Sequence, residues 1–508
     1  MKRVNKNNVI RVFAAIMLVF IIASNKSDAK EHKNVVVILV DDMGWTDLGS
    51  YGSSFYDSPN IDKLANEGVK FTNGYAMCPV CSPTRASIQT GRYPNRTGIT
   101  DWIVGLKYTL GESKYDRLLS ADNKFDLNLR EKTIAEVMKE NGYKTYFAGK
   151  WHLGQTKEFW PQNQGYDVNI GGCHMGMPKL RPEQNINGFF TPYGIPTLED
   201  GPSGEYLPDR LTDETIDFIE SNKEDPFFVF LSYYLVHVPL QSKDSLINIY
   251  KEKRKEMGLD DEKEFLTDEP WMDKVWQADK DPYNYKERII QSEPIYAAMV
   301  RSLDINVGRV LDALEKLELD DNTMIVFTSD NGGLSTAQGS VTNNAPLRAG
   351  KGWLYEGGIR VPFIIKNPDN PNNGIESEMM VSSIDVFPTV LGYAGIPTNQ
   401  VNIDGINLLP FLNENAKNSR PLFWHYPHYP GQGGNPGSVI RKGKFKLIDD
   451  LETGELELYD LEADIGEKNN LADNLPEVRD ELYLMLKGWR QELDVKKMDP
   501  NPYWNGIK

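Results

Sequence analysis

The sequence has few cysteines, no excess of basic residues and no internal repeats, and each shortage narrows the class of protein. Only three cysteines, Cys78, Cys81 and Cys173, occur in 508 residues, so a four-thiolate zinc site is impossible and stability must come from a core rather than from disulfides. Against 73 acidic residues stand 56 basic ones, giving a net charge of −17. This balance argues against a nucleic-acid partner. What remains is a large acidic chain with ample hydrophobic material for a core.

The first 29 residues have the pattern of a secretory signal. Four basic residues precede the apolar run at 12–23, and small and polar residues follow it to about Ala29; the basic residues are Lys2, Arg3, Lys6 and Arg11. The run is too short and too one-sided for a spanning helix. We therefore predict a cleaved signal peptide at 1–29, a periplasmic or secreted protein and no stable membrane insertion, with an uncleaved anchor as the alternative.

Continuous apolar runs alternate with helical patterns through the first three quarters of the chain. The predicted strands are 34–40, 144–148, 227–232 and 323–328, and the predicted helices include 61–68, 133–141, 213–221 and 296–317. Apolar runs of this kind are typical of parallel strands covered on both faces. The alternation predicts a doubly wound α/β sheet, in which ligands bind beyond the carboxyl ends of the strands.

The remaining chain predicts a smaller second unit. Residues 439–461 have strand periodicity with a turn at Thr453-Gly454, and residues 477–493 are helical. We expect a catalytic domain at 30–395, a linker at 396–420 and a C-terminal subdomain at 421–508, built as an antiparallel sheet with a helix packed on it. A charged insertion at 243–285 is predicted to form solvated helix faces, with a substrate-gating role as the alternative.

The stretch M-C-P-V-C-S-P-T-R-A-S-I-Q-T-G-R at 77–92 has the pattern of a nucleophile site. Ser82 is a good N-cap and Gly91 is placed to end a helix. Cys81 would then lie at a helix N-terminus, which favours negative charge, and Arg85 adds a permanent cation one turn later. Cys78-x-x-Cys81 could instead be a redox pair, half a zinc site or two structural cysteines.

The motif C-S-P-T-R-A-S-I-Q-T-G-R resembles the signature of the type I sulfatases, C-x-P-x-R followed by T-G-R. Y-D-L-E-A-D-I-G-E-K-N-N-L-A resembles the C-terminal subdomain of the same family, so the resemblance runs from about residue 33 to about 494. It implies that Cys81 is oxidised to formylglycine by a formylglycine-generating or sulfatase-maturating enzyme. The hydrated aldehyde would be the nucleophile, and the fold would be that of the alkaline phosphatases.

Two pairs of oxygen-bearing side chains follow predicted strands: Asp41 with Asp42, and Asp330 with Asn331. Carboxylate and amide oxygens suit a hard cation, and Ca2+ fits them better than Zn2+. Paired aspartates after a strand are also common as caps or turns, but the resemblance implies one calcium ion held by all four. Alkaline phosphatases are the rival enzymes of the same fold. Their two-zinc sites need several histidines, and this chain has six in all.

Four further residues lie within motifs of the same family. Lys150 and His152 in G-K-W-H-L-G and His237 in L-V-H-V-P follow predicted strands, and Lys351 lies in A-G-K-G-W-L-Y-E-G-G. The resemblance implies that the two lysines hold the sulfate oxygens. It also implies that His237, together with Lys351, protonates the leaving alcohol and that His152 deprotonates the hydrate. Arg85 would stabilise the hydrate.

Clustered aromatic, histidine and glycine residues at 423–441 predict a loop that contacts sugar. Its candidates for substrate binding are His425 and His428, and Trp102 could line the same pocket; a buried packing role is the alternative. The prediction is a secreted sulfatase acting on sulfated glycans, with galactose or N-acetylgalactosamine as the first candidates. A phosphatase or phosphonate hydrolase of the same fold and a non-catalytic glycan-binding relative remain as alternatives.

Overall fold

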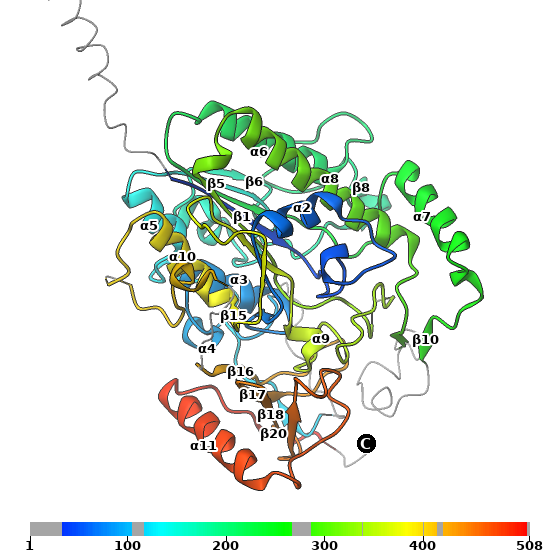
Figure 1. The fold of residues 1–508 in the computed structure, drawn as a ribbon, viewed down its shortest axis with the longest axis vertical. Helices are drawn as coiled ribbons and strands as arrows, with labels where there is room; N and C mark the ends of the chain where they lie inside the picture. Colours follow the sequence, from blue (N-terminus) through cyan, green and yellow to red (C-terminus); the bar gives the residue numbers. More distant parts are fainter. Residues whose placement is uncertain are drawn as a thin grey trace, which may run out of the picture.

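A computed structural model of the protein describes residues 33–103, 116–266, 286–337, 339–399, 401–413 and 420–504. The signal peptide predicted at 1–29 lies outside these ranges. Within them the chain forms a large mixed sheet covered by helices and a smaller antiparallel sheet with its own helix (Figure 1). The predicted fold class is therefore confirmed.

The four predicted strands form the middle of the large sheet. They are β1 (Asn34–Val40), β5 (Lys144–Gly149), β9 (Phe227–Ser232) and β12 (Thr323–Ser329). The pairs β12–β1, β1–β9 and β9–β5 are all parallel. Every residue of β1, β9 and β12 is buried, as expected for strands covered on both faces. Their carboxyl ends consequently meet at one edge.

Shorter strands extend this sheet to eight, in the order β14-β2-β13-β12-β1-β9-β5-β6. The added strands are β2 (Val69–Phe71), β6 (Val168–Ile170), β13 (Phe363–Lys366) and β14 (Ile375–Ser377). Because β13 runs antiparallel to both β12 and β2, the sheet is mixed.

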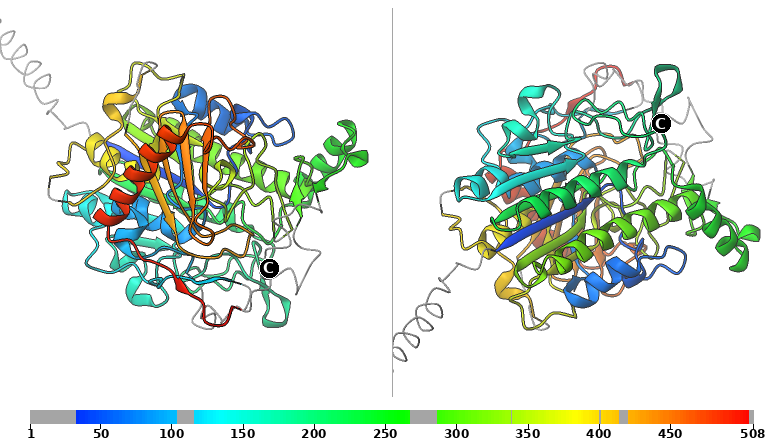
Figure 2. Two further views of the ribbon diagram at one scale, coloured as in Figure 1. Left: turned by 90° about the horizontal axis from the view of Figure 1, so that it is seen from below. Right: turned by 90° about the horizontal axis from the view of Figure 1, so that it is seen from above.

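Helices lie on both sides of the sheet. One group comprises α2 (Pro59–Glu67), α6 (Leu207–Ser221) and α8 (Pro294–Lys316), which pack on one another across one face (Figure 2, right). The other comprises α3 (Cys81–Thr90), α5 (Ile134–Glu140) and α10 (Val386–Tyr393). The charged insertion contains α7 (Asp244–Glu256), which is mostly exposed as predicted, and its residues 267–285 lie outside the described ranges.

The C-terminal unit is a four-stranded antiparallel sheet. Its strands are β16 (Leu422–Tyr426), β17 (Gly437–Lys442), β18 (Phe445–Asp450) and β19 (Leu456–Asp460). Helix α11 (Pro476–Glu492) packs against β17 and β18 (Figure 2, left). The turn predicted at Thr453-Gly454 joins β18 to β19, and Gly454 has the positive φ of 75° that such a turn favours.

The other short elements connect these layers. They are α4 (Pro94–Thr97), α9 (Glu356–Ile359), β3 (Gly74–Tyr75), β4 (Leu118–Leu119), β7 (Leu180–Arg181), β8 (Ile186–Asn187), β10 (Phe265–Leu266), β11 (Glu287–Arg288), β15 (Val381–Ser382) and β20 (Asp499–Pro500). Among the described residues, no helix is both long and apolar enough to cross a membrane.

The start of α3 differs from the sequence prediction. The helix begins at Cys81, and the residue at its N-cap is Val80, which makes no side-chain capping bond. Ser82 is not the cap, because its hydroxyl instead donates to the His152 carbonyl at 3.0 Å and accepts from Ile103 N at 3.0 Å. The helix ends at Gly91 as predicted, with a φ of 67° at the C-cap.

The chain leading into α3 packs with the C-terminal unit. Tyr75, Met77, Cys78 and Val80 share a hydrophobic cluster with the buried side chains of the four-stranded sheet and α11. Most of the large sheet's side chains belong to a separate cluster. The C-terminal unit therefore supports the segment that presents Cys81.

Candidate active site

Charged side chains from four neighbouring strands lie together beyond the carboxyl edge of the large sheet. Asp41 and Asp42 follow β1, while Asp330 and Asn331 follow β12; all four are buried. The remaining members come from the segments after β5 and β9, from α3 and from the loop before α9; they are Lys150, His152, His237, Cys81, Arg85 and Lys351. The structure thus brings together all ten residues predicted for catalysis and metal binding.

Three buried cations pair with three buried carboxylates. Lys150 Nζ lies 2.8 Å from both carboxylate oxygens of Asp41. Lys351 Nζ lies 2.7 and 2.8 Å from the two oxygens of Asp42. Arg85 donates from Nε at 2.8 Å to Asp330 Oδ2, with its NH2 group at 2.7 Å from the same oxygen. The attraction within these three pairs offsets part of the cost of removing the groups from water.

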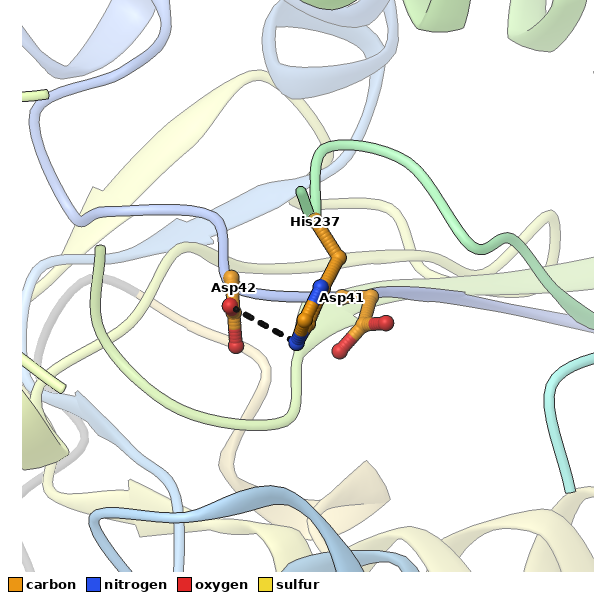
Figure 3. Close-up of side chains that lie close together, drawn as sticks. All are labelled: Asp41, Asp42 and His237. Carbon is orange, nitrogen blue, oxygen red and sulfur yellow. Dashed lines mark ion pairs between the residues drawn. The ribbon is translucent and has the colours of Figure 1, made fainter. Parts of the chain in front are cut away.

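The donors at this edge fit a hard cation. Asn331 Nδ2 donates to Asp42 Oδ1 at 2.8 Å, and the buried Asn331 Oδ1 has no hydrogen-bond partner among the described residues. Ligand atoms of Asp41, Asp42 and His237 all lie within 4.8 Å of one another (Figure 3). An orphaned amide oxygen beside three carboxylates is the inventory that Ca2+ or Mg2+ prefers.

The two adjacent aspartates have pKa values shifted in opposite directions. Burial raises the pKa of Asp41 well above its usual range; Lys150 opposes this shift, while the carboxylates of Asp330 and Asp42 add to it. Burial also opposes ionisation of Asp42, but the charge and the hydrogen bond of Lys351 outweigh it and lower the pKa. The environment therefore separates two carboxyls that are neighbours in sequence.

Cys81 lies at the first turn of α3, and its side chain faces His152. The Cys81 Sγ atom is 3.5 Å from His152 Nδ1. Burial raises the pKa of the Cys81 thiol, so the thiolate needed for redox or thiol chemistry is disfavoured. Cys78 and Cys81 are both free thiols in the structure.

The hydrogen bonds of His152 fix which nitrogen carries its proton. Its Nε2 atom lies 2.8 Å from the Ile103 carbonyl oxygen. Because a carbonyl only accepts, Nε2 carries the hydrogen and Nδ1 keeps a lone pair directed at Cys81 and Ser82. Burial, followed by the charge of Lys150, holds the pKa of His152 well below its usual value. The ring is therefore a neutral base facing residue 81.

His237 has the opposite arrangement. Its Nδ1 lies 2.8 Å from the Val238 carbonyl oxygen, so Nδ1 carries the hydrogen. Its Nε2 lies 3.2 Å from Lys351 Nζ. Burial lowers the pKa of His237 to about 3. The pair of His237 and Lys351 thus holds its proton on the lysine, with the imidazole as acceptor.

Within the part of the chain that the structure describes, the three residues predicted to bind substrate make no hydrogen bond or ion pair with this cluster. Trp102 is 41% exposed. His425 lies in β16, where its ring nitrogens are 2.7 Å from Ser438 Oγ and 2.8 Å from the Lys496 carbonyl oxygen. His428 is fully buried, with Nε2 at 2.9 Å from Thr100 Oγ1. Residues 423–426, predicted to be part of a loop, instead belong to a strand.

Sequence reasoning missed two polar contacts of the site. Ser232, the last residue of β9, accepts a hydrogen bond from Arg85 at 2.7 Å and donates to the Lys150 carbonyl at 2.8 Å. A search for polar residues at strand ends would have found it. The Ile103 carbonyl that orients His152 gives no such signal, because it is a backbone group of an apolar residue.

Comparison with known proteins identifies the family. The sulfatase family model matches residues 33–396, and a model of the C-terminal part of N-sulphoglucosamine sulphohydrolase matches residues 349–492. A sulfatase of Formosa agariphila is 31% identical, covering 95% of this chain and 92% of the relative. Human N-acetylgalactosamine-6-sulfatase is 30% identical, covering 78% of this chain and 69% of the relative.

A solved structure supports the same assignment. The structure of Ps i-CgsB in complex with k-i-k-neocarrahexaose is 28% identical to this chain, with a TM-score of 0.69. The match covers 93% of this chain and 94% of that one. Together with the family model, which spans most of the chain, these relatives show that the protein belongs to the sulfatase family and is a hydrolase of sulfuric esters.

Proposed function

We propose that the protein hydrolyses sulfate esters of carbohydrates with a formylglycine made from Cys81 as nucleophile and with one calcium ion. The observation that carries the proposal is the placement of residue 81. It lies at the start of α3, with its side chain toward the lone pair of His152 and within the electrostatic influence of the buried Lys150 and Lys351. A helix N-terminus and two amino groups favour an anionic ester at this point.

The side chains have distinct tasks in this proposal. Lys150 and Lys351 hold the sulfate oxygens, and Arg85 stabilises the hydrate of residue 81. Asp330 takes the proton of one hydrate hydroxyl as its oxygen attacks sulfur in line. The bond between sulfur and the alcohol oxygen breaks, and the pair of His237 and Lys351 supplies a proton to the departing alcohol. His152 then takes the proton of the second hydroxyl, the aldehyde re-forms and sulfate leaves.

We propose that Asp41, Asp42, Asp330 and Asn331 hold the calcium ion. When bound, the cation supplies positive charge that stabilises sulfate oxygens and the developing oxyanion. The buried Asn331 Oδ1 and the cluster of Asp41, Asp42 and His237 support a cation at this place.

The carbohydrate part of the proposal is supported by the relatives and by one exposed aromatic residue. One relative is an N-acetylgalactosamine-6-sulfatase, and the solved structure contains a neocarrahexaose. We propose Trp102, 41% exposed, as a sugar contact. We propose that His425 and His428 support this surface from within the protein and do not touch the sugar, because the structure buries both and gives them partners within the protein.

Location and maturation complete the proposal. The segment at 1–29 would export the protein to the periplasm or outside the cell, where sulfated polysaccharides are available. A formylglycine-generating or sulfatase-maturating enzyme would modify Cys81. Residues 30–395 would form the catalytic domain, 396–420 the linker and 421–508 the C-terminal subdomain.

Mass spectrometry of the tryptic peptide that contains residue 81 tests the nucleophile. We expect the mass of an aldehyde in place of the thiol, and Cys81→Ala should abolish sulfate release while leaving binding of a sulfated sugar measurable. Full activity of Cys81→Ala would refute the mechanism. Faster release of phosphate than of sulfate from matched sugar esters would favour a phosphatase of the same fold.

A further inference from the structure

The segment at 99–103 contacts both Ser82 and His152. The Ile103 carbonyl accepts from His152 Nε2 at 2.8 Å, and Ile103 N donates to Ser82 Oγ at 3.0 Å. The same serine hydroxyl donates to the His152 carbonyl at 3.0 Å. His152 itself has a φ of 56°, a conformation that persists only where its surroundings impose it. Displacement of Ile103 would therefore disturb the catalytic base directly.

Two side chains of the C-terminal unit anchor this segment. Tyr426, the last residue of β16, donates from its hydroxyl to Asp101 Oδ1 at 2.7 Å. Two residues later, His428 Nε2 lies 2.9 Å from Thr100 Oγ1. Both aromatic rings are fully buried and pack edge to face, with centroids 5.3 Å apart.

A third anchor comes from the catalytic domain. Asn123 Oδ1 accepts from Thr100 N at 2.8 Å and from Asp101 N at 3.1 Å. Asp101 Oδ1 also accepts from Trp102 N at 2.9 Å. The backbone just before Ile103 is thus held from two sides, by Asn123 on one side and by Tyr426 and His428 on the other.

We propose that Tyr426 and His428 are positioning residues, which act on His152 through Asp101, Thr100 and the Ile103 carbonyl. They keep the hydrogen of His152 on Nε2 and the lone pair on Nδ1. This inference rests on the proposed function, because it assigns Nδ1 of His152 the task of deprotonating residue 81.

The chemical consequence concerns the second half of the reaction. In that step His152 Nδ1 takes the hydroxyl proton of the sulfated hydrate. The O–H electron pair becomes the new C=O bond, and the bond between carbon and the sulfate oxygen breaks with its electrons on sulfate. If the Ile103 carbonyl moves away, a neutral His152 can carry its hydrogen on Nδ1 and can then no longer accept this proton.

Paired substitutions separate positioning from general stability. Thr100→Val removes the hydroxyl that contacts His428 while keeping the shape, and Thr100→Ser restores the hydroxyl. Tyr426→Phe removes the bond to Asp101. Tyr459→Phe is its matched control: Tyr459 is also buried in the C-terminal sheet and bonds a carboxylate, Glu457 Oε2, at 2.7 Å.

The first measurement needs no turnover. In the full-length protein labelled with 15N-histidine, imidazole nitrogen shifts report the tautomer of each ring, and His152→Gln identifies the signals of His152. We expect the Nε2–H form in the wild type, Thr100→Ser and Tyr459→Phe. Thr100→Val and Tyr426→Phe should show a growing share of the Nδ1–H form.

The second measurement is the steady-state rate on a sulfated sugar, with thermal melting to confirm folding. We expect kcat to fall roughly tenfold in Thr100→Val and Tyr426→Phe, a part of what a general base contributes, with KM little changed and sulfated residue-81 peptide accumulating. Folded variants with unchanged kcat and unchanged tautomer would overturn the proposal. So would equal losses in Tyr459→Phe, which would indicate stability alone.

The two proposals can fail separately. If residue 81 remains a thiol and no sulfate is released by the wild type, the proposed function fails whatever the tautomer. If sulfate release and the aldehyde are found but His152 keeps its tautomer in both variants, only the positioning role fails. If either variant does not fold, the other still decides the outcome, because each removes a different anchor.

Discussion

At the scale of single residues, the proposed cation site depends on buried side chains, and one of them offers an oxygen without a partner. Asp41, Asp42 and Asp330 are each paired with a lysine or arginine, whereas Asn331 Oδ1 has no partner among the described residues. A buried carbonyl oxygen without a hydrogen-bond partner is costly. A cation ligated by Asn331 would remove this cost, which links metal binding to stability.

We predict that Ca2+ raises the melting temperature of the wild type. Asn331→Ala should need at least about ten times more calcium for the same rise. A ligand bound only by the native state stabilises it in proportion to the logarithm of its concentration over Kd. Calorimetric melting over a calcium titration measures the response after chelation. The control is Asn367→Ala, a buried asparagine in another part of the fold. An identical calcium response in Asn331→Ala would exclude Asn331 as a ligand, and two zinc ions per chain would contradict the calcium assignment.

At the scale of elements, the periodicity of the sequence predicted more than its local capping signals did. The strands at 34–40 and 323–328 were recognisable because both faces are buried, so the apolar run is continuous. The helix at 477–493 was recognisable from its pattern and is found at Pro476–Glu492. Ser82, by contrast, satisfies the local rule for an N-cap, but two tertiary hydrogen bonds take its hydroxyl instead.

The site was predictable to the extent that it lies at strand ends or within family motifs. Asp41 and Asp330 follow apolar runs, so their meeting could be inferred from the parallel sheet alone. The strand at Leu422–Tyr426 was missed because its aromatic and histidine residues are also typical of a sugar-binding loop. Nothing in the sequence places Tyr426 beside Asp101, because that contact spans 325 positions of the chain.

A buried ion cluster joins α9 to the C-terminal sheet. Lys446 of β18 lies 3.1 Å from Glu356 Oε1 and 2.7 Å from Glu467 Oε1, and all three side chains are fully buried. Burial raises the pKa of Glu467 to about 7, although Lys446 opposes the shift. Lys351 lies in the loop just before α9, so this cluster connects the second unit to the active site.

We predict that Lys446→Met destabilises the protein by about 3–5 kcal/mol at pH 8, because it leaves the buried Glu467 without its ion-pair partner, whereas Glu356 keeps its pair with Arg360. The loss should be smaller at pH 5.5, where a carboxyl with a raised pKa becomes neutral by binding a proton. Denaturant unfolding at both pH values provides the measurement. Lys442→Met, which breaks an exposed pair with Glu481, should cost at most about 1 kcal/mol. Equal losses in the free energy of unfolding for the two variants would show that the buried cluster stabilises the protein no more than an exposed ion pair does.

At the scale of the whole molecule, the buried histidines make stability depend on pH. Burial lowers the pKa of His425 to about 4 and that of His428 to about 3, against about 6.5 in an unfolded chain. Between these values the unfolded chain binds protons that the native protein does not. Stability contributed by the neutral rings is therefore fully present above pH 6.5 and is lost as the pH falls toward 4.

We predict that the melting temperature falls between pH 7 and pH 5 and that His425→Gln makes this fall shallower. One fully shifted group changes the free energy of unfolding by about 1.4 kcal/mol per pH unit. The variant should be less stable than the wild type at pH 7, since it disturbs a buried pair of hydrogen bonds. The informative quantity is how much less stable His425→Gln is than the wild type, compared between pH 7 and pH 5. A variant with the full wild-type pH dependence would contradict protonation of His425 as a cause.

The choice of substrate is also a property of the whole molecule, because it depends on which surface continues from the sulfate site. Trp102 is exposed and directly follows Asp101, which Tyr426 holds in place. A sugar ring can pack against an indole face, whereas a small aryl sulfate presents little beyond its ester. We predict that Trp102→Ala lowers kcat/KM roughly tenfold on a sulfated galactose or N-acetylgalactosamine oligosaccharide and less than threefold on a nitrophenyl sulfate. Tyr426→Phe should instead lower kcat on both substrates alike, because the step that His152 serves follows departure of the alcohol. Equal losses on both substrates in Trp102→Ala would remove Trp102 from the sugar surface and leave the chemistry at residue 81 unaffected.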